Sequence, residues 1–128
     1  MFSLNMLKER YLIVYGLTDD EITRLNSRFV SGCKRKPLVI EKHMGNYTLS
    51  ALMGSEEYEV EGAKLPEEKV IIFNGFQGVY LQQGVKKVRD VLGKEPILAS
   101  TTPNSVKMKI SELFAHLMAE RQYFKNKS

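Results

Sequence analysis

The segment YLIVYGLTDDE at residues 11–21 decides the fold, because it passes directly from a strand pattern to a helix start. Its first five residues are aliphatic or aromatic, a composition typical of a strand that is covered on both faces. Gly16 ends this run. Thr18 and Glu21 follow with the spacing of a capping box, in which each side chain accepts a hydrogen bond from the other residue's backbone N–H. This order of features predicts an α/β unit.

A helix and a second short strand are expected after this segment. Ile22, Leu25 and Phe29 recur at helical spacing and give the helix one apolar stripe, and Gly32 is its expected end. The apolar run LVI at residues 38–40 then predicts another buried strand. Neighbouring parallel strands need a crossover of this kind, so this part of the chain predicts a β–α–β arrangement.

The same order of features recurs 59 residues later in the chain. The segment VIIFNGFQGVY at residues 70–80 repeats the strand, the glycine and the start of a helix. The glycine after the strand and the proline before the next one are 21 residues apart in both halves, as Gly16 and Pro37 and again as Gly75 and Pro96. A constant offset of this kind is hard to obtain by accident, and it predicts an internal repeat.

Beyond the second predicted strand of each half, the offset becomes 61 residues. YTL at residues 47–49 then corresponds to MKI at residues 108–110, and each stretch leads into a predicted helix. The first of these helices is brief. The last is the longest of the chain, with an apolar face at residues 110–118 that reaches Tyr123 or Phe124 if the pattern continues.

We therefore predict one domain over residues 1–128, with an internal repeat at residues 11–54 and 70–125 joined by a segment at residues 55–69. Two tandem βαβα units most simply form an α/β fold, a small, mostly parallel sheet of about four strands with helices packed on it. The joining segment is interpreted as an acidic linker or as an added edge strand. The order of the strands does not follow from the pattern.

The composition is that of an ordinary globular protein, with 43% hydrophobic and 27% charged residues. No apolar run approaches the roughly 20 residues needed to cross a bilayer, and no membrane association is expected. The single cysteine, Cys33, cannot form an internal disulfide, which is typical of a reducing compartment. We therefore expect a cytoplasmic protein.

Charge is unevenly distributed along the chain. Residues 55–68 contain six glutamates and one lysine, a net charge of −5 in a chain whose total is +4, so the remainder carries +9. Basic residues cluster at positions 34–36, 86–89 and 107–109, but no aromatic residues that could stack on bases stand between them. Internal compensation of charge is therefore favoured over binding to nucleic acid.

Four short segments resemble a known family. TTPN at residues 101–104, MKISEL at residues 108–113, VIIFNGF at residues 70–76 and PILA at residues 96–99 are similar to the domain-of-unknown-function family 3783, whose members are small prokaryotic βαβα domains. The resemblance extends over residues 70–124. It implies a bacterial or archaeal protein of unassigned activity, and it supplies no catalytic residue.

Polar loops that follow the strands are the first places to look for a ligand site, since ligands of open α/β sheets bind at the carboxyl ends of strands. These loops lack the glycine patterns of dinucleotide and phosphate-binding loops, so no cofactor is expected. His43, His116 and Cys33 lack the paired spacing of metal ligands, so no metal site is expected. The candidate ligand-binding residues are Thr18, His43, Asn46, Asn74, Gln77, Thr101, Thr102 and Asn104.

Three hypotheses for the function remain open. The favoured one is a non-catalytic module that binds a small molecule or a protein partner, including a second copy of itself in a homodimer. The first alternative is a small enzyme that uses His43 and the loop at residues 101–104. The second is a weak nucleic-acid binder that uses its basic helices. Fold alone does not choose among them.

Overall fold

The computed structural model describes residues 7–33, 35–54 and 64–127 of the chain. These residues group into two compact units. The sheet unit comprises residues 7–33, 35–40 and 68–101, and the helical unit comprises residues 41–54, 64–67 and 102–127. Residues 55–63, which make up most of the predicted acidic linker, lie outside the described residues.

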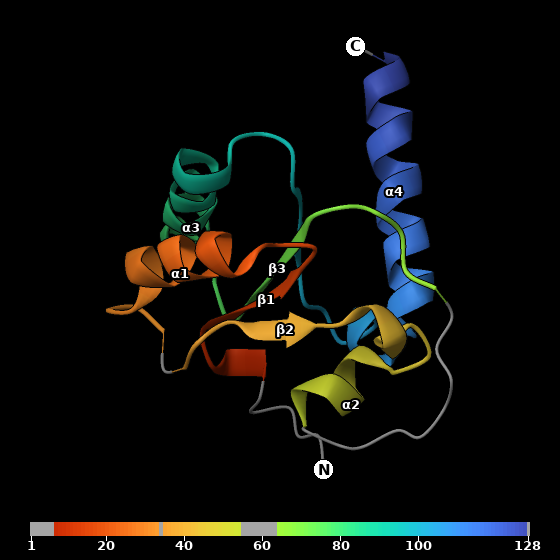
Figure 1. The fold of residues 1–128 in the computed structure, drawn as a ribbon, viewed down its shortest axis with the longest axis horizontal. Helices are drawn as coiled ribbons and strands as arrows, with labels where there is room; N and C mark the ends of the chain where they lie inside the picture. The colour runs from red at the N-terminus through yellow and green to blue at the C-terminus, as the bar shows by residue number, and fades with distance from the viewer. Residues whose placement is uncertain (1–6, 34, 55–63, 128) are drawn as a thin grey trace. The chain divides into compact units, whose positions relative to one another are not determined.

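The described part of the sheet unit contains β1 at Tyr11–Tyr15, α1 at Asp19–Phe29, β2 at Leu38–Ile40, β3 at Val70–Asn74, α3 at Val79–Leu92 and β4 at Ile97–Ser100. The strands form one sheet in the order β2-β1-β3-β4 (Figure 1). β1 is parallel to β2 and β3 is parallel to β4, whereas the central strands β1 and β3 are antiparallel. The predicted α/β fold with a four-stranded, mostly parallel sheet is confirmed, and the antiparallel central pair makes the sheet mixed.

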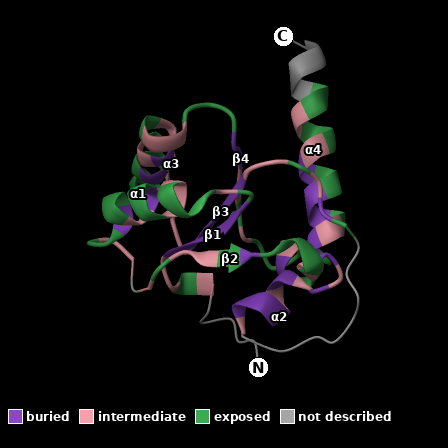
Figure 2. Ribbon diagram, in the orientation of Figure 1, coloured by how far each residue is buried: buried purple, intermediate pink, exposed green. Residues whose placement is uncertain are grey.

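Helices α1 and α3 cover the same face of the sheet (Figure 1). The central strands β1 and β3 are buried along their whole length (Figure 2). The predicted apolar stripe of α1 faces this core, and the helix ends at Phe29, three residues before Gly32. The buried core residues between the helices and the sheet are Leu12, Val14, Leu25, Phe29, Ile71, Phe73 and Val88.

The glycine that follows each central strand is required by the backbone. Gly16 and Gly75 have φ angles of 79° and 78°, a left-handed conformation that side chains other than glycine rarely adopt. A Cβ on Gly16 would overlap the carbonyl oxygen of Glu68, and a Cβ on Gly75 would lie 2.6 Å from the carbonyl oxygen of Glu9. Both positions therefore need glycine for two reasons, the dihedral angle and the close approach of another backbone.

The described part of the helical unit contains two 3₁₀ turns, η2 at Lys42–Met44 and η3 at Ser105–Lys107, the short helix α2 at Leu49–Met53 and the long helix α4 at Ile110–Lys127. Thr48 caps α2, since its Oγ1 accepts from the backbone N–H of Ala51 at 3.1 Å. The segments that lead into α2 and α4 pair with each other in an antiparallel bridge between Thr48 and Lys109. The predicted brief and long helices are therefore both present.

The buried face of α4 is shorter than the sequence pattern allows. Ile110, Leu113, Phe114 and Leu117 are buried, whereas Tyr123 is 55% exposed. The apolar face therefore does not continue to Tyr123, and the side chain of Phe124 lies outside the described residues. Within the described ranges, every helix is too short or too polar to span a bilayer.

Candidate functional site

Two of the predicted ligand-binding residues, Asn74 and Thr101, are in direct contact. Asn74 is fully buried at the end of β3. Its Nδ2 donates to the carbonyl oxygen of Glu9 at 2.7 Å, and its Oδ1 accepts from Thr101 Oγ1 at 2.7 Å. Because both ends of this amide are engaged inside the protein, Asn74 fixes the backbone next to Arg10 rather than offering a group to a ligand.

The hydroxyls of the other two predicted threonines are occupied by nearby backbone groups. Thr18 Oγ1 accepts from the backbone N–H of Glu21 at 3.1 Å and caps α1. Thr102 Oγ1 accepts from the backbone N–H of Ser105 at 2.9 Å, at the start of η3. Asn104 is exposed just before the same turn. These hydroxyls therefore act as turn and helix caps.

His43, Asn46 and Gln77 lie in other places. His43 is exposed in η2, and its Nδ1 lies 3.6 Å from Glu41 Oε2. Asn46 is half-buried, and Gln77 is exposed before α3. The enzyme hypothesis needs the loops after β2 and β4 to converge. The chain leaves β2 and β4 at opposite ends of the sheet, because these strands run in opposite directions. The segments that follow nevertheless belong to the same helical unit and pair there at Thr48 and Lys109, so strand direction alone does not separate His43 from residues 102–104.

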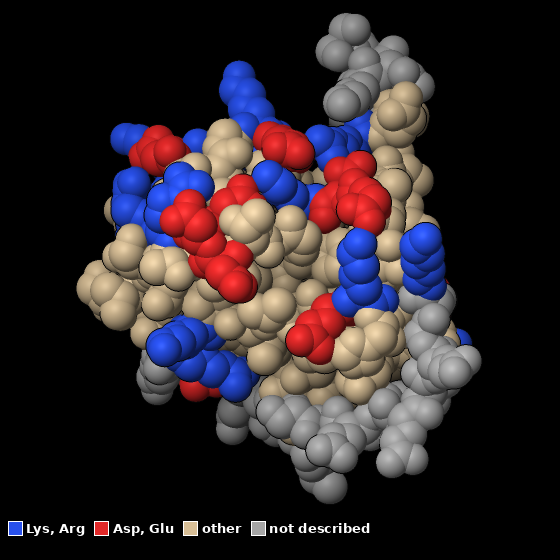
Figure 3. Space-filling view, in the orientation of Figure 1, with Lys and Arg blue, Asp and Glu red and all other residues tan. Residues whose placement is uncertain are grey.

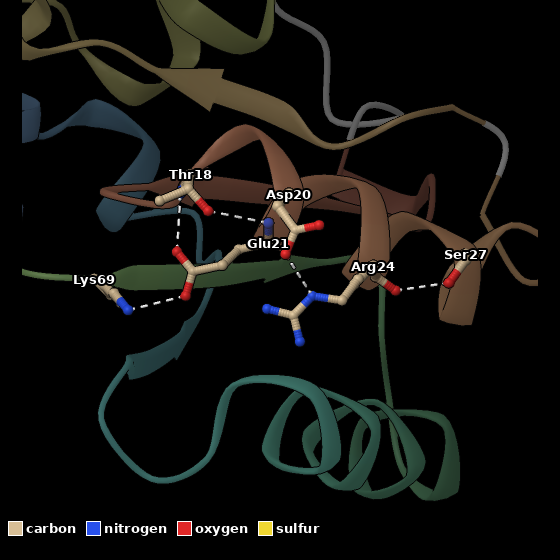
Figure 4. A network of polar contacts seen from close by, with 6 residues as sticks. All are labelled: Thr18, Asp20, Glu21, Arg24, Ser27 and Lys69. Carbon is tan, nitrogen blue, oxygen red and sulfur yellow. Dashed lines mark hydrogen bonds and ion pairs between the residues drawn. The ribbon is translucent and has the colours of Figure 1, made fainter.

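Acidic residues at the start of α1 are held by polar contacts (Figure 4). Glu21 Oε1 accepts from the backbone N–H of Thr18 at 2.9 Å, and Glu21 Oε2 accepts from Lys69 Nζ at 2.9 Å. These hydrogen bonds lower the pKa of Glu21, and the bond to Glu21 raises the pKa of Lys69. The carboxylate of Glu21 therefore occupies the donors at this helix start, where an external anion would otherwise bind.

A pocket of about 230 Å³ opens in the sheet unit between the end of α1 and the side of α3. Arg10, the residue just before β1, lines the pocket. Phe76 lines it from the loop between β3 and α3. The α3 residues of the lining have the i, i+3, i+4, i+7 spacing of one helix face. The described lining residues are Arg10, Phe29, Ser31, Gly32, Phe76, Tyr80, Gln83, Gly84 and Lys87.

Aromatic rings and cations make up most of the pocket wall. Phe76 packs edge-to-face against Phe29, with centroids 5.9 Å apart. The guanidinium of Arg10 lies 4.5 Å from the centroid of the Tyr80 ring, and Lys87 Nζ lies 5.3 Å from that of Phe29. Both cations are half-buried, and none of the described lining residues is acidic. The pocket therefore combines apolar walls with positive charge.

Residues related by the 59-residue offset provide an internal comparison for Arg10. Arg10 and Tyr80 correspond to Lys69 and Glu21. The cation lies against the helix start in both places, but Lys69 meets a carboxylate at 2.9 Å, whereas Arg10 meets an aromatic ring. A ring stabilises a cation without neutralising it, so the charge of Arg10 stays uncompensated at the pocket.

The same comparison holds for the other cation of the pocket. Lys87 and Ser31 correspond to Arg28 and Asp90, and Arg28 Nη2 lies 3.4 Å from Asp90 Oδ2. At the pocket, the position matched to Asp90 is therefore a serine. Arg10 and Lys87 thus have cationic counterparts that pair with carboxylates, while neither of them pairs with an acidic residue within the described ranges.

A third matched position differs in the size of its side chain. Leu25 of α1 is fully buried, and its counterpart on α3 is Gly84. The absent side chain admits aromatic rings, since a Cβ on Gly84 would lie 3.1 Å from Phe73 Cε1 and 3.5 Å from Phe76 Cδ2. The aromatic rings beside the pocket therefore pack against a glycine at the position that Leu25 fills at the 59-residue offset.

Cys33 lies near the pocket but is an ordinary thiol. It packs against the core beneath α1 and α3, and burial raises its pKa. The positive charges of Arg10 and Lys87 act in the opposite direction and are the smaller effect.

Metal-ligating side chains do not gather in the part of the chain that the structure describes: no group of three or more histidine, cysteine, aspartate or glutamate residues could hold a metal ion there. His116 is exposed on α4 and lies 2.9 Å from Glu120.

The sequence analysis did not find this pocket because its residues come from separate segments. Lys87 belongs to a basic cluster that has no aromatic neighbours along the chain, and Phe29 reaches it only through the packing of α1 on α3. One signal was present in the repeat itself. At the 59-residue offset the acids Glu21 and Asp90 are matched by Tyr80 and Ser31, so an acid is present at one position of each pair and absent at the other.

Comparison with known families identifies one part of the chain. Residues 69–124 match the family described as a domain of unknown function (DUF3783). The resemblance seen in the sequence is confirmed over this segment. The DUF3783 segment contains β3, α3 and β4, and it contributes Phe76, Tyr80, Gln83, Gly84 and Lys87 to the pocket. No curated protein and no solved structure matches the chain.

Proposed function

We propose that the protein is a non-catalytic module that binds a small anionic ligand in the pocket between the end of α1 and α3. The observation that carries this proposal is the pair of half-buried cations, Arg10 and Lys87, in a lining whose described residues include no acid. A cation that is partly removed from water and has no carboxylate partner is stabilised when an anion binds beside it.

The contacts of Arg10 suit an anion. A guanidinium that stacks on an aromatic ring keeps its N–H groups in its own plane, where they can donate to two oxygens of a carboxylate or phosphate. The guanidinium carbon of Arg10 lies 4.5 Å from the centroid of the Tyr80 ring, and Asn74 holds the backbone of the preceding Glu9. The cation is therefore positioned before a ligand arrives, which reduces the entropy lost on binding.

The pocket supports binding rather than catalysis. The described lining offers the hydroxyl of Ser31 and the amide of Gln83 besides its cations and rings. It includes no histidine or carboxylate that could serve as a general base beside that hydroxyl. On the face in Figure 3, acidic and basic side chains alternate over α1, which favours a small anion over a nucleic-acid strand.

A titration that changes only charge tests this proposal. Benzoate and its neutral analogue benzamide are added to the ¹⁵N-labelled full chain at constant ionic strength, and amide shifts are recorded by NMR. We expect benzoate to shift the amides of Arg10, Ser31, Gly32 and Lys87, and benzamide to bind about tenfold more weakly, because a charge-assisted hydrogen bond is lost.

A matched pair of variants shows whether the site is the one proposed. Lys87→Met is expected to weaken benzoate binding about tenfold. Arg28→Met removes the same charge at the related position, where Asp90 is the partner, and is expected to leave binding unchanged. Equal affinity for benzoate and benzamide, or equal effects of the two variants, would contradict the proposal.

We further propose that the two halves arose by duplication of one βαβα unit. Within the sheet unit, β1 and β3 pair in antiparallel register so that Ile13 lies opposite Ile72, its own counterpart at the 59-residue offset. Within the helical unit, Thr48 pairs with Lys109, its counterpart at the 61-residue offset. Contacts between matched residues support an approximate twofold relation between the halves.

We also propose a cytoplasmic setting in a bacterium or archaeon. The single cysteine with a raised pKa suits a reducing compartment, and the resemblance of residues 69–124 to a family of small prokaryotic domains suits the source. Cell fractionation followed by immunodetection of the full chain tests the compartment. Recovery in the membrane or the secreted fraction would contradict it.

A further inference from the structure

We infer that the ligand of the pocket is an anion built on a single planar aromatic ring, such as an aryl carboxylate or an aryl phosphate. This inference rests on the proposed function, since it names the chemical class of the anion. Three features carry it: the rings of the wall, the volume of the pocket, and the position of the cations relative to the rings.

The walls supply aromatic contacts in the orientations that a further ring prefers. Phe76 already makes edge-to-face contacts with Phe29 at 5.9 Å and with Phe73 at 5.4 Å, with interplanar angles of 85° and 80°. Edge-to-face and offset-stacked pairs stabilise a complex beyond the contribution of the area that they bury. A planar ligand ring extends this cluster, whereas a flexible aliphatic group has no matching geometry.

Tyr80 offers aromatic surface at the mouth of the pocket. Tyr80 is 54% exposed, so a large part of its aromatic surface is in contact with water. An apolar ligand that covers part of this surface removes it from water, which is the ordinary driving force of small-molecule binding.

The volume of the pocket suits one ring and one charged group. A buried apolar cavity of about 150 Å³ holds one benzene molecule. The pocket measures about 230 Å³, so a benzene-sized ring leaves space for a carboxylate or a phosphate. A whole nucleotide needs more space than this.

The cations lie where the charged group of such a ligand would be. Arg10 and Lys87 each contact the face of a wall ring, Tyr80 and Phe29 respectively. Their charges therefore lie beside the aromatic surface rather than at a distance from it. A carboxylate attached directly to a ring keeps its oxygens in the ring plane, so one rigid ligand can reach the wall and the cations together.

The experiment compares probes that share a charge but differ in the ring. Benzoate, phenyl phosphate, cyclohexanecarboxylate and acetate are titrated into the full chain by calorimetry at pH 7 and constant ionic strength. We expect benzoate or phenyl phosphate to bind roughly three- to tenfold more tightly than cyclohexanecarboxylate, from the aromatic contact alone. Acetate is expected to bind more weakly still.

A second pair of variants tests the contribution of the ring at the pocket mouth. Tyr80→Leu keeps an apolar side chain and removes the ring, so the preference for benzoate over cyclohexanecarboxylate is expected to fall. Tyr123→Leu is the matched control, because Tyr123 is 55% exposed on α4. The melting temperature of each variant shows whether it remains folded.

The outcomes separate this inference from the proposed function. If acetate or cyclohexanecarboxylate binds as tightly as benzoate, and Lys87→Met weakens all of them, the aromatic inference is wrong and the anion site stands. If no probe binds, or if Lys87→Met has no effect on binding, both are wrong. A phenyl phosphate preference identifies the phosphate class, and a benzoate preference identifies the carboxylate class.

Discussion

The starts of α1 and α3 occupy matched places in the sheet unit, yet they are built from different chemistry. At α1, Thr18 caps the helix and Glu21 binds Lys69. At α3, the residue before the helix is Gly78, which makes no side-chain cap, and Tyr80 carries the guanidinium of Arg10 on its ring. At the start of α1 a carboxylate pairs with the cation, whereas at the start of α3 the cation lies beside a pocket without a carboxylate partner.

This difference separates what the fold requires from what a site requires. The shared features are glycines with positive φ, apolar stripes and a cation before each central strand, and these suffice to build both halves. The features that differ are the partners of the cations and the residue at the position of Leu25 and Gly84. Two related places in one chain can therefore be compared as a site and its internal control.

The largest expected effect comes from the glycines that both halves share. Gly16→Ala and Gly75→Ala are each expected to lower the free energy of unfolding by about 4 kcal/mol, because a left-handed backbone and a backbone overlap are both penalised. Chemical denaturation of both variants measures this. Similar losses support the equivalence of the two turns, and a loss in only one would break it.

Variants of two other glycines separate the effect of the left-handed backbone from that of the backbone overlap. Gly93 has a φ of 74° and no atom within 4 Å of an added Cβ, so Gly93→Ala is expected to lose only about 1–2 kcal/mol. Gly32 has open space and no positive φ, so Gly32→Ala is expected to change stability by less than about 0.5 kcal/mol. If Gly93→Ala costs as much as Gly75→Ala, the overlap with Glu9 is not a cause.

A smaller effect is expected at the matched positions of Leu25 and Gly84, whose side chains differ in volume. Leu25→Ala opens space at the position matched to Gly84 and is expected to lower the free energy of unfolding by about 3 kcal/mol. It is not expected to create a second benzoate site, because Glu21 and Asp90 already neutralise the nearby cations. Calorimetric stoichiometry checks this, with Leu25→Met as a volume-conserving control. Two sites per chain would show that volume, rather than charge, distinguishes the halves.

The smallest expected effect concerns pH. The folded pKa of Glu21 lies below its ordinary value of 4.5, so its stabilising contribution is complete above that value and is lost as pH falls through the lowered folded pKa. Glu21→Gln keeps a capping acceptor but does not ionise. Wild type is therefore expected to exceed this variant in stability at pH 7 and to approach it in acid.

Urea unfolding at several pH values measures this convergence. The difference in stability between wild type and Glu21→Gln could instead stay constant from neutral to acid pH. That result would show that the ion pair between Glu21 and Lys69 does not stabilise the start of α1.

Much of the fold follows from neighbours along the chain. The capping box of Thr18 and Glu21, the cap by Thr48 and the apolar stripe of Leu25 and Phe29 each depend on residues three or four positions apart. These interactions form wherever the segment becomes helical, so the sequence predicts them directly. The same locality explains the prediction for β1, whose five residues are all buried.

The candidate site is less predictable from the sequence, because the polar residues near strand ends also have the residue types that bind the backbone. Asn74, Thr18 and Thr102 are of the expected types and in the expected places, but the backbone uses their hydrogen-bonding groups. A polar side chain in a loop satisfies either the backbone or a ligand, and its identity alone does not distinguish the two.

By itself the sequence determined the strands, the helices and the capping box of Thr18 and Glu21, because those depend on short-range spacing along the chain. Only the tertiary structure decided that β1 and β3 run antiparallel, that Arg10 meets Tyr80, and that Lys87 lies over Phe29. These contacts join segments far apart in the chain. The energy of each contact depends on how far its groups are buried and on which group lies beside the cation. Both are set only when the chain folds.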